Sequence, residues 1–347
     1  MTAWTPTLAL TRRMALALPL AAAIRPARAA EAERVRIGLL HTLSPAPLYI
    51  AMQRGYFGDQ GIDAQFRFFD AAQPIAAAAV SGDIDLGITA LTGGFFSLAG
   101  RGLLKVIAGG LHEQKGWPGI GLLASKGAFD AGLTSPAKLA GHSLGITQYG
   151  SSFHYMAGRI AQVEGFDLKT VTLRPLQTIQ NMLAAVRTGQ VDATMAIASQ
   201  ARPADASGEA RLIAWVGDLV PYQLTAMFAR SGLLAGDADA VHRTVRAYQR
   251  GVADYRTAFL RRDAAGQPVQ DESTDTAVAD ITHYVFEGDA GAKAKILADV
   301  GWYDADAALD ADDVARQVRW FGEQGLIREA ADPASLIDLR FVPALGA

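Results

Sequence analysis

Residues 73–85, QPIAAAAVSGDID, return in altered form 107 residues later as residues 180–192, QNMLAAVRTGQVD. Both stretches predict an alanine-rich helix that ends near a glycine and is followed by a buried strand. The same offset relates Gly38 to Gly145, each of which lies in a short apolar run typical of a parallel strand. The chain is therefore expected to contain two similar α/β lobes with a crevice between them.

Strands alternate with helices along both copies, and this alternation predicts parallel sheets joined by right-handed crossovers. The expected strands are residues 34–40, 64–69, 86–89 and 105–109 in the first copy, and 143–147, 170–174, 191–197 and 212–216 in the second. Two further strands, 120–125 and 224–229, are expected to cross between the lobes. The fold class is therefore α/β, with two lobes that are each a mostly parallel sheet flanked by helices. Lobe 1 comprises residues 34–115 and 225–347, and lobe 2 comprises residues 116–224.

Ligands of such sheets bind beyond the carboxyl ends of the strands, where loops lead into helix N-termini. The loops expected to meet in the crevice are residues 41–46, 70–73 and 89–93 of lobe 1 and residues 148–152, 177–180 and 197–200 of lobe 2. Candidate ligand-binding residues on or beside these loops are His41, Thr42, Ser44, Thr89, Thr92, Tyr149, Gly150, Ser151, Ser152 and Gln177. Two more candidates, His112 and Tyr222, lie near the predicted crossings.

The candidate residues are compatible with two classes of ligand. Gly150, Ser151 and Ser152 open a predicted helix, whose free N–H groups and positive dipole end favour an anion such as a sulfonate, carboxylate or phosphate. Gln177 and Tyr149 instead favour a small planar heterocycle, because an amide both donates and accepts and an aromatic ring can stack. Capping, turn formation and packing are the alternative roles of these residues. The sequence leaves the ligand class open.

The first 29 residues have the features of a cleavable export signal. Arg12 and Arg13 precede an apolar run, 14–24, that is too short to cross a bilayer. Ala27-Arg28-Ala29 then has the small-x-small pattern of a signal-peptide cleavage site. The paired arginines resemble a twin-arginine signal, but the phenylalanine and lysine usual after the pair are absent, so the general secretion route stays open. Residues 1–29 are therefore expected to direct the protein to the periplasm.

Composition and spacing argue against several classes of function. The formal net charge is −3 and no basic block stands out, which argues against nucleic acid as a partner. The chain has no cysteine, which excludes disulfides, thiolate metal sites and cysteine nucleophiles. Its six histidines show no metal-ligand spacing, and Ser151, Ser152 and His154 are too close in sequence to form a catalytic triad. We expect no metal, no cofactor and no catalytic residue.

Several short motifs occur in an order and spacing that resemble one family. They are Leu48-Tyr-Ile-Ala, Gly55-Tyr-Phe, Gly61-Ile-Asp, Ser81-Gly-Asp-Ile-Asp, Gly150-Ser-Ser and Thr188-Gly-Gln-Val-Asp-Ala. Together they resemble periplasmic solute-binding proteins of ABC importers, of the nitrate/sulfonate/taurine type that also contains carriers of thiamine pyrimidine precursors. The resemblance implies a type II periplasmic-binding-protein fold with two hinge crossings, which closes on a small solute and delivers it to an ABC permease in the inner membrane. We expect a monomer without enzymatic activity.

The resemblance leaves alternatives open. Residues 194–200, TMAIASQ, lack the aromatic-rich Asp-Pro segment often found in sulfonate carriers, so the ligand remains a sulfonate, carboxylate, nitrate or pyrimidine. The same fold carries enzymes, including pyrimidine-precursor synthases and a chorismate-type dehydratase. The synthases use a His/Cys-rich motif that a cysteine-free chain cannot supply, and both kinds of enzyme work in the cytosol. An enzyme on this scaffold, or a secreted ligand sensor, is the alternative function.

Overall fold

The computed structural model describes residues 1–5, 32–327 and 332–346 of the chain. The helices and strands of the described residues all lie within the unit Ala32–Ala347. The predicted export signal, residues 1–29, lies outside the described residues apart from its first five. Across the described ranges, no helix is both long enough and apolar enough to cross a membrane.

The first sheet contains five strands in the order β2-β1-β3-β12-β4. Their bounds are Glu33–Leu40 for β1, Ile62–Phe69 for β2, Leu86–Ala90 for β3, Leu104–Gly109 for β4 and Thr225–Arg230 for β12. β1 pairs in parallel with β2 and β3, whereas β12 is antiparallel to both β3 and β4. Four strands therefore run in one direction, and β12, which comes from a distant part of the chain, runs in the opposite direction.

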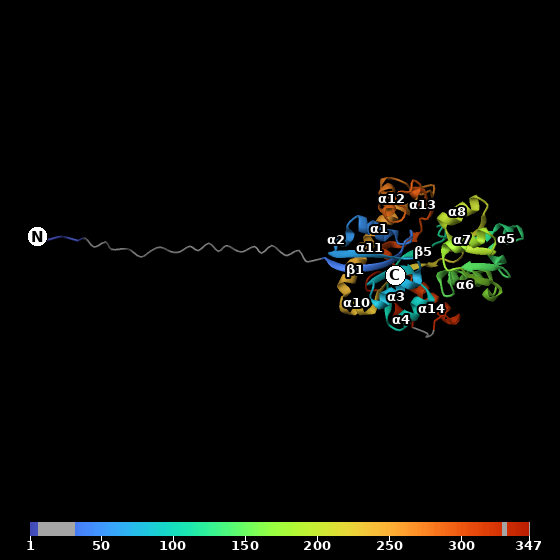
Figure 1. The fold of residues 1–347 in the computed structure, drawn as a ribbon, viewed down its shortest axis with the longest axis horizontal. Coiled ribbons are helices and arrows are strands. Elements are labelled where there is room, and N and C mark those ends of the chain that lie inside the picture. The colour runs from blue at the N-terminus through green and yellow to red at the C-terminus, as the bar shows by residue number, and fades with distance from the viewer. Residues whose placement is uncertain (6–31, 328–331, 347) are drawn as a thin grey trace. The chain divides into compact units, whose positions relative to one another are not determined.

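The second sheet repeats this arrangement in the order β8-β7-β9-β6-β10. Its strands are β6 (Ile120–Ser125), β7 (Ser143–Ile146), β8 (Thr172–Pro175), β9 (Ala193–Ile197) and β10 (Ala210–Trp215). β7 is parallel to β8 and β9, and β6, which enters from the first sheet, is antiparallel to β9 and β10. The predicted α/β class with two similar, mostly parallel sheets is confirmed. Figure 1 shows α5, α6, α7 and α8 in green and yellow-green around the second sheet.

The sequence repeat and the structural repeat coincide, because β3 and β9 are offset by the same 107 residues as the two quoted stretches. An aspartate directly before each of these strands binds the strand that opens its copy of the repeat, which is β1 in the first copy and β7 in the second. Asp85 accepts a hydrogen bond from the N–H of Arg36 at 2.9 Å. Asp192 accepts one from the N–H of Ser143 at 2.8 Å. A carboxylate at the same place in each copy therefore ties the third strand to the first.

Helices cover both sheets. Their bounds are Ala46–Gln53 (α1), Tyr56–Asp59 (α2), Ala72–Ser81 (α3), Gly93–Gly100 (α4), Lys126–Asp130 (α5), Ser152–Glu164 (α6), Ile179–Arg187 (α7), Ala198–Ala206 (α8), Val216–Leu219 (α9), Ser231–Gly236 (α10), Ala238–Phe259 (α11), Glu272–Val285 (α12), Ala292–Ala298 (α13) and Ala311–Glu323 (α14). Gly82 ends α3 in the left-handed conformation, as the sequence predicted. α1 packs on the long helix α11, whose buried face includes Val241, Tyr248 and Val252 at the predicted helical spacing.

A third, small sheet lies where the chain passes between the two large ones. It has the order β11-β5-β13, with bounds Tyr222–Gln223, Leu111–Glu113 and Trp302–Tyr303. Gln223 is fully buried, and its side chain donates a hydrogen bond to the carbonyl of Thr225 at 2.8 Å. Its backbone N–H donates to Asp313 at 3.0 Å. We propose this sheet as the hinge, with lobes at residues 34–115 plus 225–347 and at residues 116–224.

Candidate functional site

Loops at the carboxyl ends of strands from the two sheets meet, as the sequence predicted for them. The N–H of Gly93, after β3, donates a hydrogen bond to the carbonyl of Gly150, after β7, at 2.9 Å. Close by in sequence, the amide of Gln148 donates to the amide oxygen of Gln73, after β2. Loops 70–73 and 89–93 of the first sheet thus contact loop 148–152 of the second.

Helix α6 begins at this contact. Ser151 is its N-cap and accepts a hydrogen bond from the N–H of His154 at 3.3 Å. Gly150 adopts a φ of 80°, which a residue with a side chain rarely adopts, and its N–H donates to Nδ1 of His154 at 3.1 Å. Ser152 and Phe153 are the first two residues of the helix, so their N–H groups have no partner within it. The helix start therefore offers free backbone donors beside two serine hydroxyls.

His154 is neutral at physiological pH. Burial lowers its pKa to about 4. Because Nδ1 accepts the Gly150 hydrogen bond, the single proton of the neutral ring lies on Nε2. The imidazole consequently orders the Gly150 turn without adding a positive charge to the start of α6.

Helix α4 begins on the other side of the contact. Thr92 is its N-cap and accepts a hydrogen bond from the N–H of Phe95 at 3.1 Å. Thr89, at the end of β3, is almost fully buried, and its hydroxyl has no hydrogen-bond partner among the described residues. The Gly93–Gly150 hydrogen bond therefore joins two capped helix N-termini, one following a strand of each sheet. Both ends carry the positive pole of a helix dipole.

The candidates after β1 are occupied by contacts with the surrounding protein. The hydroxyls of Thr42 and Ser44 lie 3.0 Å apart and bond to each other. The carbonyl of Thr42 accepts a hydrogen bond from the Tyr49 hydroxyl at 3.0 Å, and the carbonyl of Ser44 accepts one from Tyr303. His41 is exposed, and its Nε2 bonds to the carbonyl of Tyr284. These contacts fix the shape of loop 41–46.

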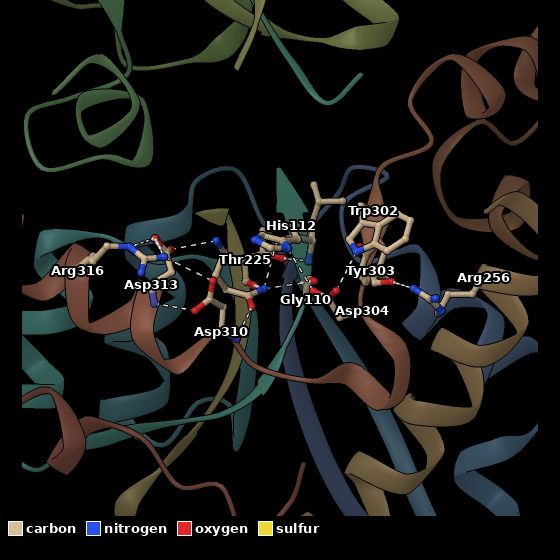
Figure 2. A network of polar contacts seen from close by, with 12 residues as sticks. Gly110, His112, Thr225, Arg256, Trp302, Tyr303, Asp304, Asp310, Asp313 and Arg316 are labelled. Carbon is tan, nitrogen blue, oxygen red and sulfur yellow. Dashed lines mark hydrogen bonds and ion pairs between the residues drawn. The ribbon is translucent and has the colours of Figure 1, made fainter. Parts of the chain in front are cut away.

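His112 and Tyr222 lie in the small sheet and are buried. Nδ1 of His112 is 3.2 Å from the Asp304 carboxylate, which also accepts a hydrogen bond from the Trp302 indole at 2.8 Å (Figure 2). Burial acts to raise the pKa of Asp304, but His112 and Trp302 hold it below its usual value. The Tyr222 hydroxyl has no partner among the described residues, and its ring packs on Tyr155 at 5.3 Å. Burial raises the pKa of Tyr222 well above its usual value.

The Tyr149 ring packs on His154 and its hydroxyl donates to the carbonyl of Leu173, whereas the N–H of Gln177 donates to the carbonyl of Thr147. Tyr149 is 56% exposed and lines a hollow of about 560 Å³ between α6 and α14, together with Trp320 and His154. Gln177 is exposed and has a φ of 69°. A second hollow, of about 640 Å³, lies along β2 and is lined by Phe66, Phe68, Phe69, Arg36, Arg67, Asp83 and Ile84. Among the residues of the predicted crevice loops, Tyr149 alone lines one of these two hollows.

Some contacts between the sheets involve residues that were not among the ligand-site predictions. Gln148 lies in the predicted crevice loop 148–152 but precedes the Gly150-Ser-Ser motif, and nothing local in the sequence marks it as a partner of Gln73. Ser199 binds the Asp299 carboxylate with its N–H and its hydroxyl, although the two residues are 100 positions apart. One local signal existed: α8 begins after Ile197, which has no side-chain acceptor to cap a helix. Within the described ranges, no group of three acidic or histidine side chains could hold a metal ion.

A family model described as NMT1/THI5 like matches residues 43–257, more than half of the 347 residues. The chain belongs to the NMT1/THI5-like family. This bears out the resemblance that the sequence motifs indicated. None of the curated proteins matches the chain in sequence.

Solved structures of similar fold come from binding proteins and from an enzyme. The periplasmic aliphatic sulphonate binding protein SsuA of Escherichia coli is 19% identical, with a TM-score of 0.67, covering 91% of this chain and 94% of its own. The alkanesulfonate-binding protein SsuA of Xanthomonas axonopodis pv. citri, bound to MOPS, is 18% identical, with a TM-score of 0.66, covering 90% of this chain and all of its own. The desulfurization enzyme DSZB, in complex with biphenyl-2-sulfinic acid, is 15% identical, with a TM-score of 0.56, covering 89% of this chain and 97% of its own. At these identities the likeness shows a shared fold.

Proposed function

We propose that this member of the NMT1/THI5-like family is the substrate-binding component of an ABC importer. It captures a small organic anion between its two sheets and delivers it to a permease in the inner membrane. The fold shared with the SsuA proteins supports this role. The export-signal features of residues 1–29 support a periplasmic location.

The observation that carries the ligand class is the hydrogen bond between Gly93 and Gly150. It brings the N-termini of α4 and α6 together, and two positive dipole ends at this distance repel each other. An anion placed between them would relieve the repulsion and accept hydrogen bonds from the free N–H groups. The hydroxyl of Ser152 and the buried hydroxyl of Thr89 are further donors on the same two loops. A sulfonate or a carboxylate therefore fits better than a neutral heterocycle.

An enzyme on the same fold is the second candidate, because DSZB has this architecture. Its complex with biphenyl-2-sulfinic acid was obtained from a cysteine-to-serine mutant. The present chain has no cysteine at any position. We therefore favour binding without turnover. Recovery of an unchanged ligand after long incubation, followed by NMR, distinguishes the two candidates, because product signals would favour the enzyme.

A true ligand is expected to stabilise the protein against heat. At 100 times its dissociation constant it should raise the free energy of unfolding by about 2.7 kcal/mol. A thermal-shift screen of alkanesulfonates, carboxylates, nitrate and pyrimidines measures this directly. Stabilisation by a pyrimidine and by no anion would contradict the proposed ligand class. No shift with any compound would argue against the binding function.

Replacing both Ser151 and Ser152 by alanine is expected to weaken binding of the anion found in that screen by about tenfold or more. The two hydroxyls are donors beside the proposed site, and a hydrogen bond to a charged group contributes about 1.5–3 kcal/mol. Calorimetry gives the dissociation constant. Ser125→Ala is the matched control, because it also removes a serine N-cap, that of α5, at the end of β6, which runs antiparallel to β9 and so ends at the opposite edge of the sheet. Equal affinity in the double variant and in the control would remove loop 148–152 from the site.

A further inference from the structure

The N-terminus of α8 is capped by a residue of another part of the fold. The other helices at the strand tips of the second sheet carry their own caps, Ser151 for α6 and Thr178 for α7. α8 follows Ile197, which cannot accept a hydrogen bond through its side chain. Asp299 supplies the missing acceptor: its carboxylate accepts from the N–H of Ser199 at 2.6 Å and from the Ser199 hydroxyl at 2.5 Å.

The position of Asp299 is unfavourable within its own segment. It is the C-cap residue of α13, and a carboxylate at a helix C-terminus faces the negative end of the dipole. At the start of α8 the same charge faces a positive end and two donors. Burial raises the pKa of Asp299 above its ordinary value, and the hydrogen bonds from Ser199 and the nearby Arg202 counter this effect only in part. The contact with α8 therefore offsets part of the cost of placing this carboxylate here.

The two ends of this contact are held by different sheets. α8 packs against β6, β9 and β10 of the second sheet. Two residues after Asp299, the N–H and the carbonyl of Gly301 both bond to the Tyr255 hydroxyl of α11, at 3.1 Å each. The next residue, Trp302, lies in β13 and pairs with β5. Figure 1 shows α13 beside α8, and the two helices are in contact.

We propose that the Asp299–Ser199 contact is a latch that holds the two sheets together in the closed form and thereby sets the affinity of the crevice. Asp299 is a positioning residue that does not touch the solute. Two other contacts join strand-tip loops of the two sheets, the backbone hydrogen bond from Gly93 to Gly150 and the neutral amide hydrogen bond from Gln148 to Gln73. The Asp299–Ser199 contact differs from both because a carboxylate accepts two hydrogen bonds in it, and we therefore expect the closed population to fall when Asp299 is replaced. This latch presupposes the hinge motion of the proposed function.

The test uses the full chain without ligand. Because the protein has no cysteine, spin labels can be attached at Lys126→Cys in α5 and Asp239→Cys in α11, whose side chains are 69% and 75% exposed. Pulsed electron paramagnetic resonance then measures the distances between the labels. Asp299→Ala is expected to lower the ratio of closed to open molecules about tenfold and to give a second distance population, since it removes two charge-assisted hydrogen bonds.

Asp289→Ala is the matched control. Asp289 precedes the same helix, and its carboxylate bonds to Lys295 and to the N–H of Gly291 within its own segment. This variant should keep the parent distribution. Asp299→Asn retains one acceptor oxygen and should shift the distance distribution less. It keeps the test informative if the alanine variant fails to fold.

An unchanged distribution in Asp299→Ala and Asp299→Asn, or an equal shift in Asp289→Ala, would overturn the latch. A negative ligand screen would instead count against the binding function, because the distance measurement needs no ligand. The two failures are therefore distinguishable.

Discussion

Replacing Gly251 by alanine is expected to destabilise the protein by about 3 kcal/mol or more, although alanine is normally the better residue in a helix. Gly251 lies within α11, where a methyl group would be 2.1 Å from the carbonyl oxygen of Pro47 and 3.0 Å from the Ala51 side chain. The Pro47 oxygen belongs to the backbone of α1, so no side-chain rotation can relieve the clash. The two helices would have to separate.

Gly322→Ala in α14 is the control for this prediction. No atom lies within 4 Å of the position that its methyl group would take. Here the ordinary helix preference applies, and we expect a gain of about 0.5–1 kcal/mol. Urea unfolding followed by circular dichroism measures both changes. Two stabilising results would show that α1 and α11 do not pack at backbone distance.

The packing of α1 also matters for the site, because α1 directly follows loop 41–46. Ser44 in that loop is held by Tyr303 of β13, and Thr42 is held by Tyr49 of α1. A displaced α1 would therefore move a wall of the proposed crevice. Loss of ligand affinity should accompany the loss of stability in Gly251→Ala.

The repeat and the alternation of strands and helices were predictable because their signals are local. A helix that ends at Gly82 needs only the residues around it, and the same holds for the start of α6 at Ser151. The repeat of the 73–85 stretch then predicted a second sheet like the first. The meeting of the strand-tip loops followed from the general geometry of parallel sheets.

The small third sheet and its polar network had no comparable signal in the sequence. β11 and β13 are two residues long, too short to show a pattern. Gln223 and Asp313 are in contact across 90 positions of sequence. The sequence placed His112 and Tyr222 near the crossings, but it gave no sign of their partners: His112 pairs with Trp302 of β13, and Tyr222 packs on Tyr155 of α6, both distant in sequence.

The sequence predicted the candidate site best at helix N-termini, because the N-cap position favours residues such as serine and threonine. Thr92 and Ser151 are N-caps in the structure, and the same hydroxyls were predicted at loops of the crevice. The Asp299–Ser199 contact could not be predicted, because a carboxylate at the end of α13 gives no indication of which helix it faces. Side chains that join separate elements therefore require the structure.

A buried carboxyl group in the small third sheet, which we propose as the hinge, should make stability depend on pH. Glu113 of β5 is 1% exposed, and its two oxygens accept hydrogen bonds from the N–H of Ile120, each at 3.2 Å. Burial raises the pKa of Glu113 to about 8 from an ordinary value of 4.5, although the N–H groups of Ile120 and Gly217 act to lower it. The carboxyl group is therefore largely protonated in the folded protein at pH 7.

The sign of the effect follows from proton uptake. Between pH 4.5 and 8 the unfolded chain releases this proton while the folded protein keeps it. The free energy of unfolding contributed by Glu113 therefore falls as pH rises through this window, by roughly 5 kcal/mol at most. It is fully present below pH 4.5, which is the reverse of the usual behaviour of a salt-bridged carboxylate.

Glu113→Gln isolates this contribution, because glutamine has nearly the shape of the protonated acid and cannot ionise. At pH 5 the variant should be close to the parent in urea unfolding. At pH 8 and above it should be the more stable protein by up to roughly 5 kcal/mol. Glu323→Gln, at an exposed position on α14, should stay near the parent throughout. A difference between Glu113→Gln and the parent that is constant from pH 5 to pH 9 would mean that Glu113 ionises in the hinge as it does in water.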